Sequence, residues 1–263
     1  MNIIKHILTP TFLLFFVVTI YSQNRGSSEV GLIAGSASFT TDYGQRYDFR
    51  SNVGGNVGFG FGLVYYYNFT DYRYRWNHRT TYFSEHFRLR GEISYMAAKL
   101  EHFGKWLEDD DVGWLKEHTG QTHLLNFGVQ LEFHWVDIVD FGSRRIPRLQ
   151  WSPYLSAGVM GNYYDPTISS TRGDWDAPGV LLPKWDINVN PTAADDSPGF
   201  TLSATIGAGT RHKLGEYSDV LIESRWQYFF SNYVDGLNAK NDPANKYNDW
   251  LLWIHVGFVY YLN

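Results

Sequence analysis

The sequence contains no cysteine among its 263 residues. A disulfide scaffold, a thiolate zinc site and a cysteine nucleophile are therefore excluded. Charged residues are also scarce, at 19%, and the formal net charge of −5 argues against a nucleic-acid partner, because proteins that bind nucleic acid are usually basic. Beyond residue 20, no apolar run approaches the roughly 18–20 residues that a transmembrane helix needs. The chain is therefore not a polytopic helical membrane protein.

Aromatic residues and glycine are abundant instead. Tyr, Phe and Trp together make up 18% of the chain, and there are 25 glycines. Disordered chains are rich in charge and poor in aromatic residues, so disorder is excluded as well. A cysteine-free chain of this composition, placed behind a signal sequence, is typical of a β-barrel in the outer membrane of a bacterium.

The first residues have the pattern of a signal peptide. Lys5 and His6 form a short positive region, and an apolar stretch broken by Thr and Pro follows from residue 7 to residue 20. We predict cleavage after Ser22, so that residues 1–22 are the signal peptide and residues 23–263 form the mature outer-membrane domain. The alternative is an uncleaved N-terminal anchor.

The mature chain alternates apolar and polar residues in eight segments of about 11–15 residues. Such alternation predicts strands, and the segments are longer than the roughly 5–6 residues usual in soluble sheets. A tilted strand crosses a bilayer with about 9–11 residues, and single-chain bacterial barrels have an even number of strands. We therefore predict an all-β fold, an eight-stranded, antiparallel, up-and-down transmembrane β-barrel of the outer membrane. The segments are 29–39, 57–69, 87–97, 125–135, 151–163, 200–211, 220–230 and 250–262.

Aromatic residues gather at the ends of these segments, at the depth that amphipathic rings prefer in a membrane. A soluble lipocalin-like or sandwich protein would have to hide these apolar stripes in a core too small for them. The end of the chain, His255-x-Gly257-x-x-Tyr260-x-Leu262, resembles the C-terminal signal that the barrel-insertion machinery recognises. One predicted interface contains Tyr65, Tyr67, Phe69, Phe133, Trp135, Trp151, Tyr260 and Tyr261, and the other contains Tyr163, Phe200, Tyr228, Phe230 and Trp250.

Charged residues on the inward face of the segments form a nearly neutral set. Strand direction places Arg88 of one strand at the depth of Glu132 in the next, and the same argument pairs Arg211 with Glu223. Paired charges in a narrow lumen of low dielectric offset their desolvation and fill the lumen. We predict a structural role for these residues; the alternatives are a conducting or catalytic role. The predicted lumen network consists of Arg88, Arg90, Glu92, Glu132, Arg211, Glu223, Arg225 and His255, with Gln130 and Gln227 nearby.

The connections between the segments alternate between the two ends of the barrel. In such barrels both termini are periplasmic and the long loops face outside. We expect a short helix within residues 106–118 and an irregular lid or binding loop over residues 165–198. Asp109, Asp110 and Asp111 are either a divalent-cation site near lipopolysaccharide phosphates or a solvated acidic face. The expected outer connections are 40–53, 98–121, 164–198 and 231–248, and the expected periplasmic ones are 70–85, 136–149 and 213–218.

Two of the expected periplasmic connections are longer than the short turns usual on that side. The first, at 70–85, combines aromatic and arginine residues, which protein interfaces enrich, and the second carries Arg144, Arg145 and Arg148. We predict that the first binds a periplasmic or other envelope protein, with ordinary loop elaboration against lipid headgroups as the alternative. The candidate partner turn consists of Arg73, Tyr74, Arg75, Trp76 and Arg79.

The sequence lacks catalytic and cofactor motifs. Gly58, Gly60 and Gly62 do not complete the G-x-G-x-x-G pattern of a dinucleotide site, and no Gly-x-Ser-x-Gly occurs. A lipid-modifying barrel would hold Ser and His together on its lipid face, whereas the outward candidates Ser224 and His123 are predicted on strands that are not neighbours. We therefore predict no catalytic residues, no cofactor and no assigned metal site.

Several stretches resemble a family of outer-membrane barrels found in the Bacteroidetes. The stretches are DYGQR at 42–46, LEHFGKW at 100–106, RWQYFFS at 225–231, VDGLN at 234–238 and NDWL at 248–251. The resemblance covers nearly all of the mature chain and implies a barrel without an established biochemical activity. Some members of the family carry a glutamate dehydrogenase label, against which the missing dinucleotide motif argues.

Two stretches, SPYLSAG at 152–158 and SNYVD at 231–235, are similar to the PorG-type barrel subunits of the type IX secretion system. PorG is associated with periplasmic ring components of that system. The resemblance therefore implies a periplasmic partner for the basic turns of this chain.

These observations predict a non-enzymatic integral outer-membrane barrel that is a structural or docking component of the cell envelope, with a link to secretion or gliding. A small pore or uptake channel is the first alternative, and a lipid-modifying enzyme the second. The expected surroundings are outer-membrane lipid and lipopolysaccharide.

Overall fold

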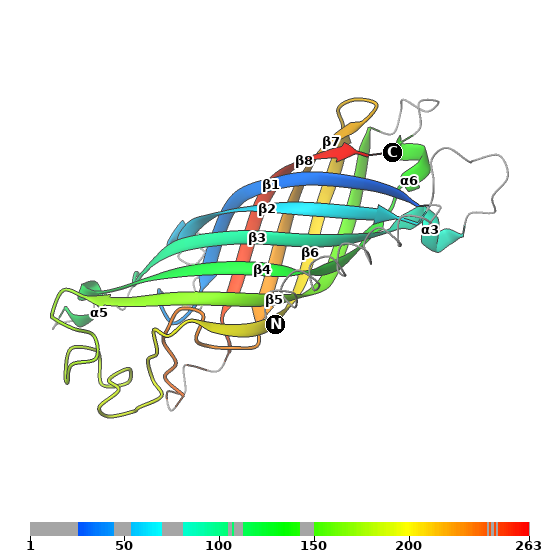
Figure 1. The fold of residues 1–263 in the computed structure, drawn as a ribbon. Coiled ribbons are helices and arrows are strands. Elements are labelled where there is room, and N and C mark those ends of the chain that lie inside the picture. The colour runs from blue at the N-terminus through cyan, green and yellow to red at the C-terminus, as the bar shows by residue number, and fades with distance from the viewer. Residues whose placement is uncertain are drawn as a thin grey trace, which may run out of the picture.

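Eight strands close into a barrel in which each strand is antiparallel to its neighbours (Figure 1). The computed structural model describes residues 26–44, 54–69, 81–104, 107, 113–142, 150–240, 242, 245 and 247–262. The first and last strands close the barrel, with Glu29 opposite Tyr261 and Thr40 opposite Trp250. The predicted fold is therefore confirmed. The strands are β1 (Ser27–Thr40), β2 (Val57–Asn68), β3 (Phe87–Glu101), β4 (His118–His134), β5 (Trp151–Ser170), β6 (Gly199–Lys213), β7 (Ser218–Phe229) and β8 (Trp250–Tyr261).

All eight predicted segments are strands, but two of them extend well beyond the predicted bounds. β4 begins at His118 rather than at residue 125, and β5 continues to Ser170 rather than ending at residue 163. The added part is paired throughout, with Thr119 opposite Ser169 near its end. Its outward residues are polar, so the apolar alternation stops before the hydrogen-bonded ladder does. Residues 165–170 therefore belong to β5 and not to the loop predicted to begin there.

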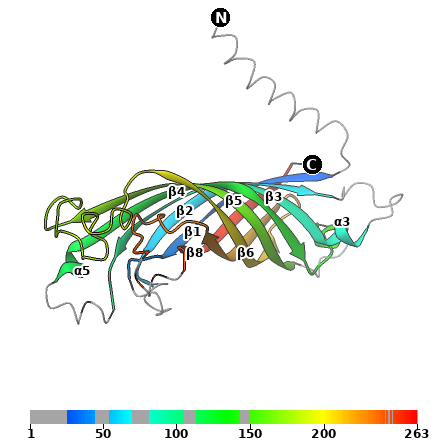
Figure 2. The ribbon, with the colours of Figure 1, turned by 90° about the horizontal axis from the view of Figure 1, so that it is seen from below.

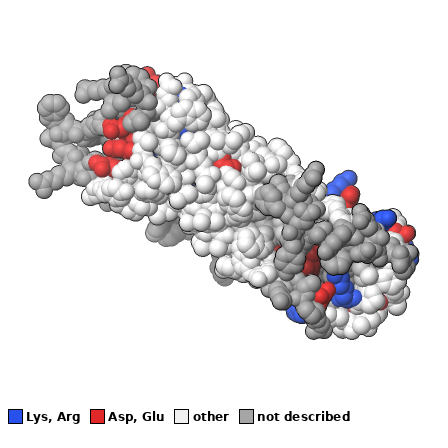
Figure 3. All heavy atoms as spheres, turned by 180° about the vertical axis from the view of Figure 1, so that it is seen from behind, with Lys and Arg blue, Asp and Glu red and all other residues white. Residues whose placement is uncertain are grey.

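The barrel is apolar outside and buries many charged and polar side chains inside, the reverse of a soluble protein. Phe59 and Leu63 are 60% and 61% exposed, whereas Arg88 and Glu132 are completely buried. Leaving such apolar surface in water would cost about 25 cal/mol per Å², and a lipid surround removes that cost. Figure 3 shows the middle of one face almost free of charged side chains, which gather toward the two ends. An outward apolar band and a polar interior place the barrel across the bacterial outer membrane.

Three short helices of the described chain lie at the ends of the barrel: α3 (Tyr82–His86), α5 (Trp114–Glu117) and α6 (Ile138–Gly142). α3 and α6 lie near the C-terminus, and α5 lies at the opposite end (Figures 1 and 2). We call the end near α3 and α6 the C-terminal end. We call the opposite end, which is formed by the connections after β1, β3, β5 and β7, the loop end. The predicted division of the connections between two ends is confirmed, and α5 lies within the range predicted for a short helix. No helix in the described parts of the chain is long and apolar enough to cross a membrane.

Aromatic side chains line the outer surface at the C-terminal end, as predicted. Neighbouring ring centroids lie between 4.7 and 5.3 Å apart, the spacing at which aromatic pairs attract. Tyr261 is an exception and a correction. Because β8 alternates, Tyr260 faces outward while Tyr261 is buried in the lumen, where its hydroxyl donates to Asp219 Oδ2 at 2.5 Å. The row of rings runs through Tyr67, Phe69, Phe83, Phe87 and Phe133.

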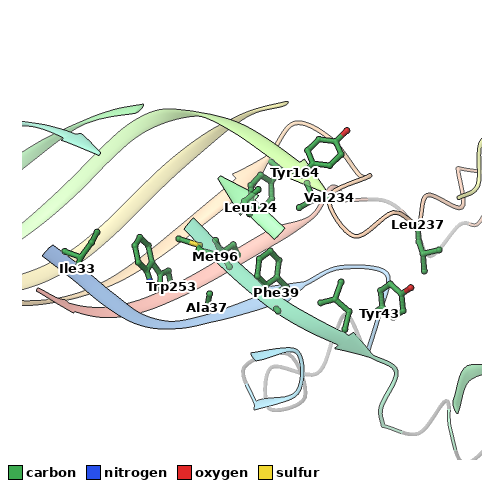
Figure 4. Packing of buried hydrophobic residues seen from close by; sticks show 14 of the residues in the cluster. Ile33, Ala37, Phe39, Tyr43, Met96, Leu124, Tyr164, Val234, Leu237 and Trp253 are labelled. Atoms are coloured by element: carbon green, nitrogen blue, oxygen red, sulfur yellow. The ribbon is translucent and has the colours of Figure 1, made fainter. Parts of the chain in front are cut away.

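The apolar core lies inside the barrel and continues into the loops of the loop end. Phe39, Met96 and Leu124 are fully buried on the inner wall. Val234 and Leu237, from the connection between β7 and β8, belong to the same cluster (Figure 4). Toward the C-terminal end the inward side chains change first to amides and then to charges. Apolar packing therefore closes the loop end, and toward the C-terminal end the charged side chains lie among further buried apolar ones such as Val64, Leu221 and Val259.

Candidate functional site

The inward charges form ion pairs that cross the lumen. Arg90 on β3 binds Glu223 on β7 through two contacts, 2.5 Å between Nη1 and Oε2 and 2.9 Å between Nη2 and Oε1. β7 is the fourth strand from β3 in a barrel of eight, so this pair joins opposite walls. Arg225 on β7 and Glu92 on β3 make the same crossing in the reverse sense, at 2.8 Å. All four side chains are buried, and their contacts fill the lumen between the walls.

A second group of ion pairs connects three further strands to this crossing. Glu29 on β1 lies 2.9 Å from Arg88 on β3 and 2.7 Å from Arg211 on β6. Arg211 also approaches Glu132 on β4 to 3.4 Å, and Arg90 donates to Glu132 at 3.0 Å. Glu132 therefore links the two groups, and the charges form one connected network. Because a buried charge without a partner is costly, each member depends on the others.

The predicted pairing of Arg211 with Glu223 is wrong. In the register, Arg211 lies opposite Leu221, and Glu223 lies opposite Gly209. Arg90 from the opposite wall forms an ion pair with the carboxylate of Glu223. Arg211 instead forms ion pairs with Glu29 and Glu132. Long guanidinium side chains extend beyond the neighbouring strand, so the register alone does not decide their partners.

The other predicted members of the network all face the lumen. Arg88 lies opposite Glu132 in the register, as predicted, and forms its shortest ion pair with Glu29. His255 is buried, with Nε2 3.8 Å from a carboxylate oxygen of Glu223. Its ring centroid is 4.3 Å from that of Trp253. The structure therefore brings the eight predicted residues together, although in a different pairing.

Sequence reasoning missed two acidic members, Glu29 and Asp219. Glu29 is the first residue of its predicted segment, and Asp219 lies one residue before its segment, so the alternation had not assigned a face to either. Asp219 lies 3.3 Å from Lys213 Nζ, near the C-terminal end. Within the described residues the network comprises five cations, Arg88, Arg90, Arg211, Arg225 and Lys213, and five carboxylates, Glu29, Glu92, Glu132, Asp219 and Glu223.

A layer of amides crosses the lumen between the charges and the apolar loop end. The amide nitrogen of Gln227 on β7 lies 2.6 Å from Asn162 Oδ1 on β5, 2.9 Å from Ser203 Oγ on β6 and 3.3 Å from Asn126 Oδ1 on β4. Side chains from four strands therefore meet at one point. Mutual hydrogen bonding satisfies polar groups that the barrel removes from water.

Replacing Glu132 with Ala leaves the buried guanidinium groups of Arg90 and Arg211 each without one carboxylate. Removing one partner of a buried pair costs about 3–5 kcal/mol, so the barrel should unfold at a lower temperature in a heat-modifiability gel. Glu117→Ala is the control, because it breaks a partly exposed pair with Arg172, and such pairs contribute about 0–1 kcal/mol. Equal unfolding temperatures for the two variants would contradict a tightly paired lumen.

The connections at the loop end pack together. We call the buried residues of these four connections the cap. The ring of His102 stacks between Tyr43, at 4.8 Å, and Trp185, at 5.3 Å, and the three residues come from three different connections. From the fourth connection Val234 is fully buried, and its carbonyl accepts a hydrogen bond of 2.6 Å from Thr122 Oγ1 on β4. The cap is therefore anchored to the barrel wall.

Backbone pairing joins the connection between β5 and β6 to the connection between β7 and β8. Ala194 and Leu237 form an isolated antiparallel bridge. Two hydrogen bonds flank it. The amide of Asn238 donates to the carbonyl of Ala193 at 2.7 Å, and the amide of Asp195 donates to the carbonyl of Gly236 at 2.8 Å. Gly236 has a φ of 86°, a conformation that other residues adopt only with strain. The lid predicted for residues 165–198 is therefore strand up to Ser170, and around Ala194 it pairs with the connection between β7 and β8.

Two carboxylates from different connections lie close together in the cap. Asp235 is buried, its Oδ2 accepts from the backbone amide of Asp42 at 2.9 Å, and its Oδ1 accepts from the amide of Leu237 at 2.8 Å. Burial, together with the neighbouring carboxylate of Asp42, raises the pKa of Asp235 to about 7. The contact between the first and last connections therefore titrates near neutral pH.

Because the pKa of Asp235 is raised in the folded state, its contribution to cap stability is full below about pH 4 and is lost as the pH rises through about 7. Protease should therefore cleave the loop-end connections faster at about pH 8.5 than at about pH 5.5, after correction with an unstructured substrate. Asp42→Asn removes the neighbouring charge, the second cause of the raised pKa after burial, and should reduce this difference. Asp176→Asn, at an exposed position, is the control and should preserve it. An unchanged pH dependence in the Asp42 variant would refute the assignment.

The outward candidates for lipid chemistry lie apart. Ser224 is on β7 and His123 on β4, which are not neighbouring strands. His123 Nδ1 lies 2.6 Å from Tyr95 Oη, and its Nε2 lies 3.0 Å from Gln121 Nε2. Among the residues that the structure describes, no group of three or more His, Cys, Asp or Glu is arranged to hold a metal ion. The two candidates therefore do not form a Ser and His pair.

Other predicted features lie outside the described residues and remain predictions. They are the signal peptide at 1–22, the candidate partner turn of Arg73, Tyr74, Arg75, Trp76 and Arg79, the acidic run of Asp109, Asp110 and Asp111, and the basic group of Arg144, Arg145 and Arg148.

No protein-family model and no curated protein matches the chain. Among solved structures it is similar to Ail, the attachment invasion locus protein of Yersinia pestis, with 13% identity, a TM-score of 0.42, and coverage of 90% of this chain and 99% of that one. It is similar to the N-terminal β-barrel domain of Pseudomonas aeruginosa OprF, with 14% identity and a TM-score of 0.41. That match covers 89% of this chain and 99% of the OprF domain. It is also similar to a major outer membrane protein from Thermus thermophilus, with 12% identity and a TM-score of 0.45. That match covers 89% of this chain and 99% of the other. Likenesses this distant transfer no function.

Proposed function

We propose that the protein is a non-enzymatic, non-conducting barrel that anchors a packed cap in the outer membrane and docks a partner of the cell envelope. The observation that carries this proposal is the pair of contacts between Arg90 and Glu223, which joins opposite walls of the lumen. An eight-stranded barrel is just wide enough for side chains to fill. A wet path for ions or nutrients would have to break this buried pair.

The cap supports the same proposal at the loop end. Val234 is fully buried beneath the connections and hydrogen-bonded to β4. The ring stack and the bridge between Ala194 and Leu237 hold all four connections together. An uptake channel would require these contacts to open in each transport event. A packed cap instead suits a protein that presents a fixed surface.

The proposed docking surface for an envelope partner lies at the C-terminal end. The connection that contains the candidate partner turn leads directly into α3, which exposes Tyr82 at 64%. The sequence of this connection contains Trp, Tyr and Arg, the residues that most often dominate the binding energy of interfaces. On the strength of the sequence resemblance to Bacteroidetes barrels and PorG-type subunits, we extend the proposal to a partner in secretion or gliding machinery.

Planar bilayers test the non-conducting part of the proposal. Purified protein should insert without giving a steady conductance, because the ion pairs of the lumen and the cap close the path at two levels. A porin reconstituted in the same bilayers is the positive control. A steady open channel would favour a small pore over an anchor.

Pull-down from native membranes tests the docking part. Replacing Arg73, Arg75, Trp76 and Arg79 with Ser should leave insertion and heat-modifiability intact, because the barrel wall is unchanged, and should remove a co-purifying envelope protein. Tyr217→Ser, in the turn between β6 and β7 at the same end, is the matched control and should retain that protein. The same co-purified proteins with wild type and the four-residue variant would remove the support for docking through this turn.

A further inference from the structure

Three neighbouring strands continue beyond the rest of the barrel wall at the loop end. β3 loses its pairing with β2 after Ala97, and β5 loses its pairing with β6 after Tyr164. Together with β4 these strands form a three-stranded extension, in which Thr119 lies between Glu101 and Ser169. In Figure 1 the extension is the part of the wall nearest α5. It therefore projects past the outward apolar band of the barrel.

The two faces of this extension differ in composition. Its inner face carries Leu100, Tyr164 and Ile168, which are buried in the same apolar cluster as Val234 and other residues of the cap. Its outer face is polar, because the outward positions of the three strands change from apolar to polar residues there. The polar outer face, as we call it, consists of Lys99, Glu101, Thr119, Gln121, His123, Asp165, Thr167 and Ser169.

The side chains along both edges of the polar outer face are accessible to a ligand. Lys99 and Glu101 on β3 are exposed, and so are Asp165, Thr167 and Ser169 on β5. Within the part of the chain that the structure describes, none of these five side chains takes part in a hydrogen bond or an ion pair. Their donors and acceptors are therefore not used within the protein.

The centre of the face is fixed by hydrogen bonds on β4. Nε2 of His123 lies 3.0 Å from Gln121 Nε2, and its Nδ1 lies 2.6 Å from Tyr95 Oη at the lower edge of the face. On the other side of His123, Tyr163 is 47% exposed. Paired strands and fixed side chains reduce the entropy lost when a ligand binds.

The height of the face distinguishes between kinds of lipid. Exposed aromatic rings such as that of Tyr163 mark the boundary between hydrocarbon and headgroups. The strand from Tyr163 to Ser169 is about 20 Å long, and the usual tilt of 35–45° leaves about 15 Å along the membrane normal. The headgroup layer of an ordinary bilayer is about 5–8 Å thick on each side. A lipid that covers the whole face therefore needs a headgroup of several units.

The chemistry of the face favours sugar among the possible occupants. Its two carboxylates and single lysine disfavour a phosphate group, which is bound by cationic donors. Half of its residues are Lys, Glu, Asp or Ser, types that are depleted in protein interfaces, and an acyl chain would bury its polar groups without partners. Sugar hydroxyls both donate to carboxylates and accept from ammonium and amide groups. An uncharged sugar chain therefore matches the whole set.

We propose that the polar outer face binds the sugar headgroup of an outer-leaflet glycolipid. Asp165, Thr167 and Ser169 bond the sugar hydroxyls from one edge and Lys99 and Glu101 from the other, while the acyl chains lie on the apolar band below. The long connections of outer-membrane barrels face outside, which places this face in the outer leaflet. The site is independent of whether the lumen conducts and of any partner at the C-terminal end.

The test uses delipidated protein in detergent and mass spectrometry of intact protein–lipid complexes. The two probes are lipopolysaccharide extracted from the producing cells and phosphatidylethanolamine. Wild type should bind lipopolysaccharide in preference to the phospholipid, whose small headgroup does not reach across the face. The double variants Asp165→Ala with Thr167→Ala and Lys99→Ala with Glu101→Ala should each weaken lipopolysaccharide binding about tenfold, because charge-assisted hydrogen bonds are lost. Phosphatidylethanolamine binding should not change.

The matched control is the double variant Asp176→Ala with Ser197→Ala. It also removes one carboxylate and one hydroxyl from exposed positions, both in the connection between β5 and β6, and should bind lipopolysaccharide as wild type does. Heat-modifiability verifies that every variant retains its barrel, and the two face variants lie on different strands, so either one tests the site alone. Equal binding of the two lipids by wild type, unchanged binding in both face variants, or the same loss in the control would overturn the proposal.

Discussion

A lumen enclosed by eight strands has room for side chains and little for water, so each charge placed inside it must find an opposite charge there. Desolvation of one guanidinium or carboxylate costs several kcal/mol, and attraction offsets that cost only when the contacts are close and well directed. The chain meets this condition with pairs that cross the barrel, Arg90 with Glu223 and Arg225 with Glu92. These contacts tie β3 to β7, so opposite walls are held together through the interior as well as through the sheet.

The cap extends the same interior toward the loop end by a different interaction. There the inward residues are apolar, and Phe39 and Leu124 form one cluster with Val234 and Leu237 of the connections. Burying a loop requires that its backbone groups find partners, which the bridge between Ala194 and Leu237 and the bond to Thr122 supply. The barrel is consequently filled by hydrophobic packing at the loop end, and by ion pairs together with buried apolar residues such as Leu221 and Val259 toward the C-terminal end.

This arrangement directs attention to the two ends of the molecule. The outer wall is occupied by lipid and the lumen by side chains, so surfaces for recognition remain where the chain leaves the membrane. At the loop end the cap holds the connections in place. At the C-terminal end, α3 exposes Tyr82, and the sequence that precedes it is rich in arginine. Both ends suit an anchored protein that binds other molecules of the envelope.

Strand number, strand order and the face of each residue could be predicted because alternation with a period of two is a local property that lipid and lumen impose on every strand. The eight lumen residues followed from the same pattern. The partner of Arg211 and the participation of Glu29 did not, since a long side chain can reach carboxylates on several strands once the barrel has closed. The inward position of Tyr261 does follow from the alternation of β8, and its placement among the outward rings did not respect that alternation. Polar outward residues likewise hid the extension of β4 and β5. The cap was decided only by the tertiary structure, because it joins residues from separate connections, and no sequence period records which loops meet above a barrel.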